Sequence, residues 1–282
     1  MTAHTYAYTF VNQQNITFYL SLYYKYPLAM KVCLLQTDIQ WQNTQENIRQ
    51  AQTLMDAQPG ADLYVLPEMW NTGFITSPTE HEQTGSAAAL AWMERTARKK
   101  ACHIIGSVAT HIEGRFRNRL YVFGPQGEVG HYNKRHLFGY GGEHLHYEAG
   151  SRRVIVECQG VRILLQVCYD LRFPVFSRNR GDYDMAIYVA SWPDSRQRVW
   201  DTLLRARAIE NQCYVCGVNR VGSDPACQYT GGSALIDAYG RTVLDLGTQQ
   251  GAQMAEIDLA KLNSFREKFA VLNDADSFEL TF

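Results

Sequence analysis

Residues 161–174 read VRILLQVCYDLRFP, a stretch in which a buried strand gives way to the start of a helix. Its first half is almost continuously apolar, which is typical of a strand covered on both faces of a sheet. The polar pair Tyr169 and Asp170 follows, and Pro174 suits the first turn of a helix. The pattern therefore predicts that Cys168 lies at a strand-to-helix turn, exposed at the edge of a sheet.

Cys168 has two interpretations at such a turn. If Cys168 is a nucleophile, nearby backbone N–H groups can stabilise an oxyanion, and the helix N-terminus would lower the pKa of the thiol. As a structural residue, it would be a buried and inert core cysteine, which is the more common role. The spacing alone leaves both open.

Strands and helices alternate outward from this stretch, which predicts one domain that mixes βα units with hairpins. The expected strands lie at about 31–37, 61–66, 102–110, 119–124, 128–132, 154–157, 162–167, 185–190, 214–219, 233–237, 242–245 and 254–257. The expected helices begin after an N-cap at Asn43, span 86–100, begin near Pro174, span 197–210, and follow the last strand.

Residues 1–29 differ from the remainder in being polar and aromatic, with Lys25 as their single lysine. Their apolar patch at 16–24 is too short for a bilayer span, which takes about 20 residues, and it lacks the basic flank of a secretory signal. We expect that Met30 is the natural start, that 1–29 is an extension outside the fold, and that 30–282 forms a single domain.

Composition narrows the possible partners. The 282 residues are 46% hydrophobic and 20% charged, with a formal net charge of −1, so neither nucleic acid nor an anionic membrane is indicated. A small molecule is the expected partner. The seven cysteines lack the density of a disulfide scaffold, which favours reduced thiols and a cytoplasmic location.

Glu68 follows the apolar strand expected at 61–66 and lies within the segment LPEMW (66–70). Carboxylates are rarely buried unless they are paired or functional. A glutamate among such neighbours indicates a desolvated acid with a raised pKa, which suits a general base. An ordinary carboxylate in a loop is the alternative.

Lys134 follows the strand expected at 128–132 and opens a long, glycine-containing segment, 134–150, with neither helical nor strand periodicity. Long loops inside compact domains are usually functional. A fixed ammonium beside a thiol favours the thiolate and can stabilise a tetrahedral intermediate. The alternative for Lys134 is a solvated surface lysine.

Two further patterns are set aside. Cys213 and Cys216 form a C-x-x-C motif, but in a strand they face opposite sides, so core cysteines are expected rather than a redox pair. Four histidines occur within a short stretch: His131, His136, His144 and His146. No cysteine or carboxylate completes a zinc pattern with them, so no metal is expected.

Seven segments together resemble the nitrilase superfamily of carbon–nitrogen hydrolases in their order and spacing. They are LPE (66–68), NKRHLF (133–138), GEH (142–144), VCYDLRFP (167–174), RAIEN (207–211), GVNRVG (217–222) and GSALID (232–237). The resemblance covers about 30–270. It implies a four-layer α-β-β-α sandwich, no cofactor, and pairing of two copies into a homodimer.

The resemblance also implies roles for individual residues. Glu68 is the expected general base, Lys134 the cation that stabilises the oxyanion, and Cys168 the nucleophile. Glu143 corresponds to a second glutamate that positions the substrate and the lysine. The backbone N–H of Tyr169 is expected to hold the oxyanion together with Lys134.

The residues after Cys168 indicate the branch of the superfamily. Tyr169-Asp170 resembles the amidases, whereas nitrilases usually have Trp-Glu there and carbamoylases Asn-Asp. Residues 168–179 and 141–147 are similar to bacterial omega-amidases, which hydrolyse 2-oxo dicarboxylic acid monoamides such as 2-oxoglutaramate. A nitrilase or an N-carbamoyl amide hydrolase is the near alternative, and a non-catalytic binding protein on the same fold is the remote one.

Such a substrate carries a carboxylate and calls for a cationic anchor. Arg172 is the candidate, although an ion pair with Asp170 is the expectation that we favour for its side chain. Ser191 stands where the relatives often have asparagine, which leaves the polarity of the pocket open.

Overall fold

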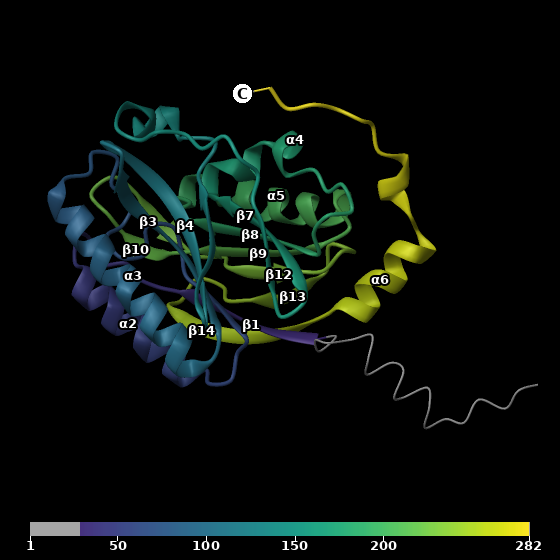
Figure 1. Ribbon diagram of the computed structural model, residues 1–282, viewed down its shortest axis with the longest axis horizontal. Coiled ribbons are helices and arrows are strands. Elements are labelled where there is room, and N and C mark those ends of the chain that lie inside the picture. Colours follow the sequence, from purple (N-terminus) through teal and green to yellow (C-terminus); the bar gives the residue numbers. More distant parts are fainter. Residues whose placement is uncertain (1–28, 282) are drawn as a thin grey trace, which may run out of the picture.

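Two six-stranded sheets form the centre of the computed structural model, which describes residues 29–281 (Figure 1). The first sheet contains β14 (Gly251–Asp258), β1 (Ala29–Gln36), β2 (Leu63–Val65), β3 (His103–Ile112), β4 (Arg115–Gly124) and β5 (Gly127–Asn133), in that order. The second contains β13 (Thr242–Asp245), β12 (Ala234–Ile236), β9 (Tyr214–Asn219), β8 (Met185–Ala190), β7 (Val161–Val167) and β6 (Ile155–Cys158). Strands β1, β2 and β3 run parallel, as do β7, β8 and β9.

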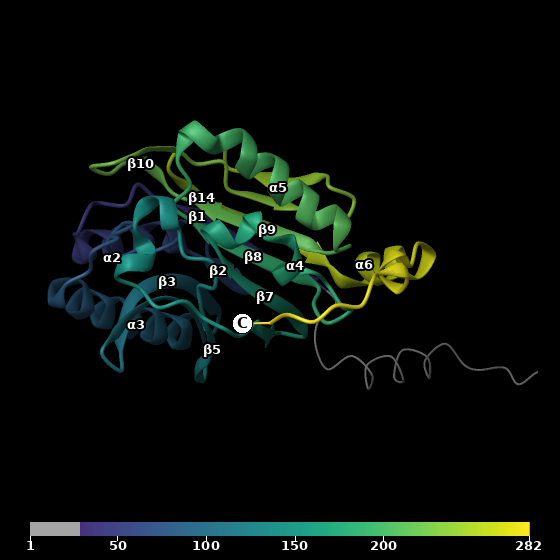
Figure 2. The same ribbon diagram turned by 90° about the horizontal axis from the view of Figure 1, so that it is seen from above.

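Helices cover the outer face of each sheet, which produces four layers (Figures 1 and 2). Helices α2 (Thr44–Ala57) and α3 (Glu80–Lys100) pack on the first sheet, and α5 (Gln197–Glu210) packs on the second. The short α4 (Pro174–Ser177) follows the turn that begins at Cys168, and α6 (Leu259–Lys268) extends from β14. The predicted α-β-β-α sandwich is therefore confirmed.

Side-chain alternation along the strands produces these layers. In β1, Val32 and Leu34 enter the core between the two sheets, whereas Cys33 and Leu35 enter the core under α2 and α3. In β7, Ile163, Leu165 and Val167 likewise face the first sheet, and Leu164 packs toward α5. A strand with two buried faces explains the continuous apolar runs in the sequence.

Several element boundaries differ from the prediction. Helix α3 begins at Glu80, well before the expected residue 86, because Thr79 and Glu82 form a capping box. Strands β3 and β4 are longer than expected and form a hairpin that was not predicted, with its turn at Glu113 and Gly114, both in the left-handed region. The expected hairpin of 119–124 with 128–132 is present as β4 and β5. The hairpin of β10 (Val221–Ser223) and β11 (Gln228–Thr230) was not predicted.

The C-x-x-C cysteines have the structural role that was expected. Cys213 and Cys216 are buried and free, and they pack into two different cores on opposite faces of the second sheet. Burial raises the pKa of the Cys213 thiol to about 12. These thiols are core residues and not a redox pair.

The predicted extension, residues 1–29, lies almost entirely outside the described residues. At its boundary, Ala29 already pairs with Asp258, and Met30 is buried between the sheets. The extension and the single domain at 30–282 remain predictions. No helix within residues 29–281 is long and apolar enough to cross a membrane.

Asp184 fastens α6 to the second sheet. Its carboxylate accepts hydrogen bonds from Arg162 on β7, at 2.7 and 3.0 Å, and from Arg266 on α6, at 2.9 Å. Burial alone would raise the pKa of Asp184, but its bonds to Arg162 and the charge of both arginines hold the pKa below its usual value.

We expect Asp184→Asn to lower the free energy of unfolding by about 2 kcal/mol near neutral pH, because two guanidinium groups lose the negative charge and one of the two acceptor oxygens. A depressed pKa stabilises the fold above the unfolded value, so the difference from wild type should shrink as pH falls below about 4. Urea unfolding of both proteins at several pH values measures this difference in the free energy of unfolding. Asp276→Asn, at an exposed position, is the control. An equal difference at acidic and neutral pH would contradict the ion-pair interpretation.

Candidate active site

The three residues expected to be catalytic lie just beyond the carboxyl ends of strands from both sheets. Glu68 follows β2, Lys134 directly follows β5, and Cys168 directly follows β7. Because β2 and β5 belong to the first sheet and β7 to the second, the site lies across the junction of the sheets. The structure brings all three to one pocket.

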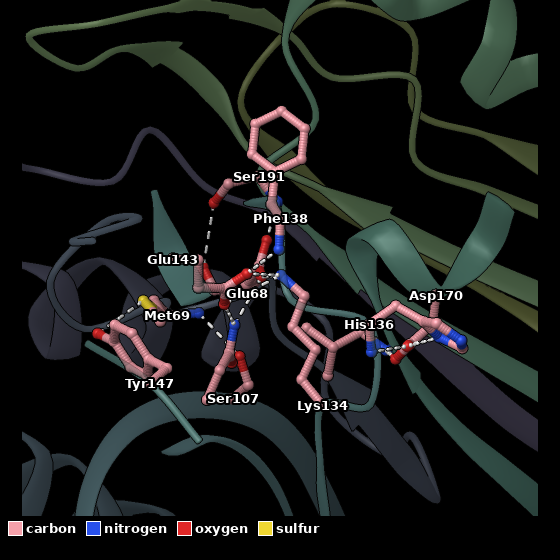
Figure 3. Close-up of polar contacts among 12 residues, drawn as sticks. Glu68, Met69, Ser107, Lys134, His136, Phe138, Glu143, Tyr147, Asp170 and Ser191 are labelled. Carbon is pink, nitrogen blue, oxygen red and sulfur yellow. Dashed lines mark hydrogen bonds and ion pairs between the residues drawn. The ribbon is translucent and has the colours of Figure 1, made fainter. Parts of the chain in front are cut away.

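Glu68 is fully buried, and its two carboxylate oxygens accept hydrogen bonds from three N–H groups (Figure 3). One oxygen, Oε1, accepts from Lys134 Nζ at 2.8 Å and from Asn118 Nδ2 at 2.7 Å. The other, Oε2, accepts from the backbone N–H of Ser191 at 2.9 Å. Donors from both sheets therefore fix the orientation of this carboxylate.

Lys134 is buried between two carboxylates, those of Glu68 and Glu143 (Figure 3). Its Nζ lies 2.9 and 3.1 Å from the oxygens of Glu143. Burial alone would lower the pKa of Lys134, but the charges of Glu143 and Glu68 outweigh it and hold the pKa above its ordinary value. Lys134 is therefore a fixed ammonium and not a solvated surface lysine.

Glu143 lies in the long loop at 134–150, which was expected to be functional. The loop contains two short turns, η1 (Gly139–Gly141) and η2 (Glu143–Leu145), joined by Gly142 in the left-handed region. The backbone N–H of Phe138 donates to Glu143 Oε2 at 2.6 Å. Burial raises the pKa of Glu143, and Lys134 partly offsets this rise.

Asn118 is a member of this cluster that the sequence did not reveal. It lies on β4, and its Nδ2 bridges the carboxylates of Glu68 and Glu143 at 2.7 and 3.0 Å. An asparagine among the polar residues of RFRNR (115–119) gives no signal of burial. Only the pairing of β4 with β3 and β5 brings it between the two acids.

Cys168 opens η3 (Cys168–Arg172) with a backbone φ of 44°. A non-glycine residue in this region is strained, and such strain is common at nucleophile turns. Burial and the negative charge of Glu68 raise the pKa of the Cys168 thiol well above its ordinary value, and Lys134 only partly counteracts them. This direction is opposite to the lowered pKa expected from the sequence, and it favours the protonated thiol.

Asp170 anchors the turn that carries Cys168. Its carboxylate accepts from the backbone N–H of Val167 at 2.9 Å and from the hydroxyl of Tyr132 at 2.8 Å. It also contacts both the backbone N–H and Nδ1 of His136, at 3.0 and 2.7 Å. Tyr132 lies on β5 and His136 just after it, so Asp170 links the Cys168 turn to the segment that carries Lys134.

The favoured ion pair between Arg172 and Asp170 is therefore not formed. Arg172 instead lines the pocket, with its guanidinium carbon 5.1 Å from the centre of the Trp192 ring and 6.0 Å from that of Tyr169. Asp170 is saturated by other donors, and this is why Arg172 is left without it. Arg172 is thus available to bind an anionic group of a substrate, which is the other role considered for it.

The pocket combines the polar cluster with an aromatic wall and encloses about 440 Å³ of space, part of it open to solvent. The pocket is lined by Glu68, Phe74, Lys134, Phe138, Cys168, Tyr169, Arg172, Ser191, Trp192, Pro193, Arg196, Cys227 and Tyr229. Arg196 and most of the aromatic residues were not predicted, because they come from segments that lie far apart along the chain.

Ser191 lies beside Glu68 as well as on the pocket wall. Its backbone N–H holds Glu68, and its hydroxyl donates to the backbone carbonyl of Glu68 at 3.3 Å. Within residues 29–281 no group of three His, Cys, Asp or Glu side chains could hold a metal ion.

Comparisons with known proteins agree with this geometry. The family model described as carbon-nitrogen hydrolase matches residues 31–267. Omega-amidase YafV of Escherichia coli (strain K12) is 45% identical, over 89% of this chain and 99% of that protein. The 2-oxoglutaramate amidase of Bacillus subtilis (strain 168) is 36% identical, over 86% of this chain and 96% of that protein.

Among solved structures, XC1258 of Xanthomonas campestris superposes with a TM-score of 0.85 at 39% identity, over 90% of this chain and 99% of that chain. It is described as a CN-hydrolase superfamily protein with an arsenic adduct in the active site. The described fold is thus shared with a related protein over nearly the full length of both chains.

We expect Asp170→Asn to lower both stability and turnover. An amide offers one acceptor oxygen instead of two, so donors around Asp170 lose partners at a cost of about 2 to 3 kcal/mol. The Cys168 turn is then no longer fixed, and kcat should fall more than KM changes. Asp237→Asn, which makes the same change at a distant turn that accepts two backbone hydrogen bonds, is the control. Unchanged kcat in a folded Asp170→Asn protein would contradict this role.

The raised pKa of Cys168 gives a second prediction. The rate of alkylation by iodoacetamide should keep rising through about pH 9, because the ordinary cysteine pKa is about 8.5 and that of Cys168 lies above its ordinary value. Peptide mapping of the modified protein measures the rate at Cys168, with Cys168→Ala as the blank. A plateau near neutral pH would show a thiolate in the free protein and contradict the neutral thiol.

Proposed function

The chain belongs to the carbon-nitrogen hydrolase family, and from that premise we propose that it is an omega-amidase. In this proposal Cys168 is the nucleophile, Glu68 the general base and Lys134 the cation that stabilises the oxyanion. The observation that carries the proposal is the buried ion pair of Glu68 and Lys134, 2.8 Å apart, in the same pocket as Cys168. A buried charge cluster costs stability and is retained where it serves chemistry.

Acylation begins with a neutral thiol. As the Cys168 sulfur attacks the amide carbon, its proton passes to Glu68, and a carbon–sulfur bond forms. The negative charge moves to the amide oxygen, where Lys134 and the backbone N–H of Tyr169 stabilise it. Collapse of this intermediate breaks the carbon–nitrogen bond, and Glu68 returns the proton to the departing ammonia.

Deacylation repeats these steps with water. Glu68 takes a proton from the water as its oxygen attacks the thioester carbon, and Lys134 again faces the oxyanion. The carbon–sulfur bond then breaks, the sulfur regains its proton from Glu68, and the acid leaves. Lys134 keeps its proton throughout, since the flanking carboxylates hold its pKa above the ordinary value.

The surrounding residues position the reactants. Glu143 holds the ammonium of Lys134 together with Glu68, and in this proposal it also orients the substrate amide. Tyr169 and Arg172 line the wall next to the nucleophile, where Arg172 binds the carboxylate of the substrate.

The proposed substrates are 2-oxo dicarboxylic acid monoamides, such as 2-oxoglutaramate, which are hydrolysed to the diacid and ammonia. Relatives named omega-amidase and 2-oxoglutaramate amidase support this choice. So does an arginine in the pocket without an acidic partner among residues 29–281, because the pocket then favours an anionic ligand.

We further propose a homodimer and a cytoplasmic location. An apolar strip runs along α5 and α6 through Ile209, Tyr239, Phe265 and Phe269, of which Ile209, Tyr239 and Phe269 are at least half exposed. Exposed strips of this kind are typical of subunit interfaces. Seven free cysteines fit a reducing compartment.

Ammonia release tests the activity. We expect turnover of 2-oxoglutaramate and much slower turnover of a nitrile or an N-carbamoyl amino acid of similar length. Cys168→Ala should abolish it, and Glu68→Gln should lower kcat by at least about 100-fold, since proton transfer is lost.

Cys227→Ala is the matched control, because this free cysteine lines the same pocket. It should retain turnover within a few-fold of wild type. Preference for the nitrile or the carbamoyl compound would move the chain to another branch of the family. Absence of any turnover, with all three compounds, would favour the non-catalytic binding protein.

A further inference from the structure

Two guanidinium groups face the active-site pocket without an acidic partner. Arg172 belongs to η3, and Arg196 ends η4 (Asp194–Arg196), which follows β8. Both line the pocket that contains Cys168. The salt bridges of residues 29–281 include neither side chain. Partly buried cations usually have such a partner, so both groups are available to an anionic ligand.

An aromatic ring holds each guanidinium in place. The guanidinium carbon of Arg172 lies 5.1 Å from the ring centre of Trp192, and that of Arg196 lies 5.4 Å from the ring centre of Phe138. Stacking on a ring restricts the planar group and leaves its N–H edge free to donate. The two arginines therefore reach the pocket from different segments with their positions already set.

We infer that Arg196 is a specificity-determining residue that binds the anionic end of the substrate together with Arg172. This inference rests on the proposed omega-amidase function and adds a residue to it. A lone carboxylate is satisfied by one bidentate guanidinium. Two guanidiniums provide donors for a carboxylate and for an adjacent oxo oxygen, which is the arrangement of a 2-oxo acid.

The charge distribution of the pocket explains why a second cation is needed. The catalytic end contains two carboxylates, Glu68 and Glu143, against the single ammonium of Lys134, so it repels an anionic group. Arg172 and Arg196 place positive charge on the wall instead. A molecule with an amide at one end and an anion at the other is thereby oriented with its amide toward Cys168.

Phe138 connects Arg196 to the catalytic cluster. Its ring lies under the guanidinium of Arg196, and its backbone N–H donates to Glu143 Oε2 at 2.6 Å. Glu143 in turn holds Lys134. Arg196 therefore packs against the residue that positions Glu143, which links the anion site to the catalytic cluster.

The test compares a charged and a neutral substrate of the same length, glutaramate and its methyl ester, alongside 2-oxoglutaramate. In Arg196→Gln we expect kcat/KM for 2-oxoglutaramate to fall about 10- to 100-fold, mainly through a higher KM, because a charge-assisted contact is lost. The fall for glutaramate, which lacks the oxo oxygen, should be smaller. The methyl ester should be unaffected. Arg198→Gln is the matched control, since Arg198 is exposed and lies outside the pocket lining.

Two further measurements separate recognition from a structural role. Arg196→Lys should recover part of the affinity, because it restores the charge without the bidentate geometry. Inhibition by 2-oxoglutarate should weaken in Arg196→Gln by a factor similar to the change in KM. Equal losses for charged and neutral substrates, or no difference between Arg196→Gln and Arg198→Gln, would overturn the inference.

The outcome also distinguishes this inference from the proposed function. If the wild-type protein released no ammonia from 2-oxoglutaramate, the omega-amidase proposal would fail. Calorimetric titration with 2-oxoglutarate would still test Arg196. Weaker binding to Arg196→Gln than to Arg198→Gln supports the anion site, and equal binding overturns it.

Discussion

The structure depends on one buried charge cluster, in which the ammonium of Lys134 lies between the carboxylates of Glu68 and Glu143. Transfer of such groups from water costs several kcal/mol for each ion, and only close pairing and additional hydrogen bonds offset this cost. Asn118 and the backbone of Ser191 supply those bonds. Misplacing any of these groups would leave a buried charge without a partner, so the cluster constrains every strand end that contributes to it.

This constraint explains why the proposed base, Glu68, and the proposed nucleophile, Cys168, come from different sheets. Glu68 belongs to the first sheet, yet one of its oxygens is held by Ser191, which follows β8 of the second. Cys168 belongs to the second sheet, yet its turn is held through Asp170 by Tyr132 of the first. The two sheets pack through an apolar core that permits sliding, whereas these directional bonds fix their register at the catalytic edge.

Much of the fold could be predicted, because apolar runs identify strands with two buried faces and the capping signal at Asn43 identifies α2. The polar partners of Glu68 could not be predicted. Asn118 and Glu68 are 50 positions apart, and Ser191 and Glu68 are 123 apart, so no local pattern connects them. The expectations for the Cys168 thiol and for Arg172 were wrong for the same reason. Both were based on neighbours in the sequence. The burial of Cys168 beside the charge of Glu68, and the full set of donors around Asp170, arise only in the folded chain.

A neutral Cys168 thiol is also consistent with the charges of the groups around it. The pKa of Lys134 is held above its ordinary value and that of Cys168 well above its own, and both directions favour one ammonium and an uncharged sulfur in the resting cluster. Passing the thiol proton to Glu68 moves negative charge from the carboxylate through sulfur to the oxyanion without changing the net charge of the buried site. A thiolate formed in advance would add a charge to a cluster that already holds two carboxylates, and burial makes that addition expensive. Attack on the amide and deprotonation of Cys168 are therefore expected to occur in one step. Lys134 then stabilises the negative charge once it has moved to the substrate oxygen.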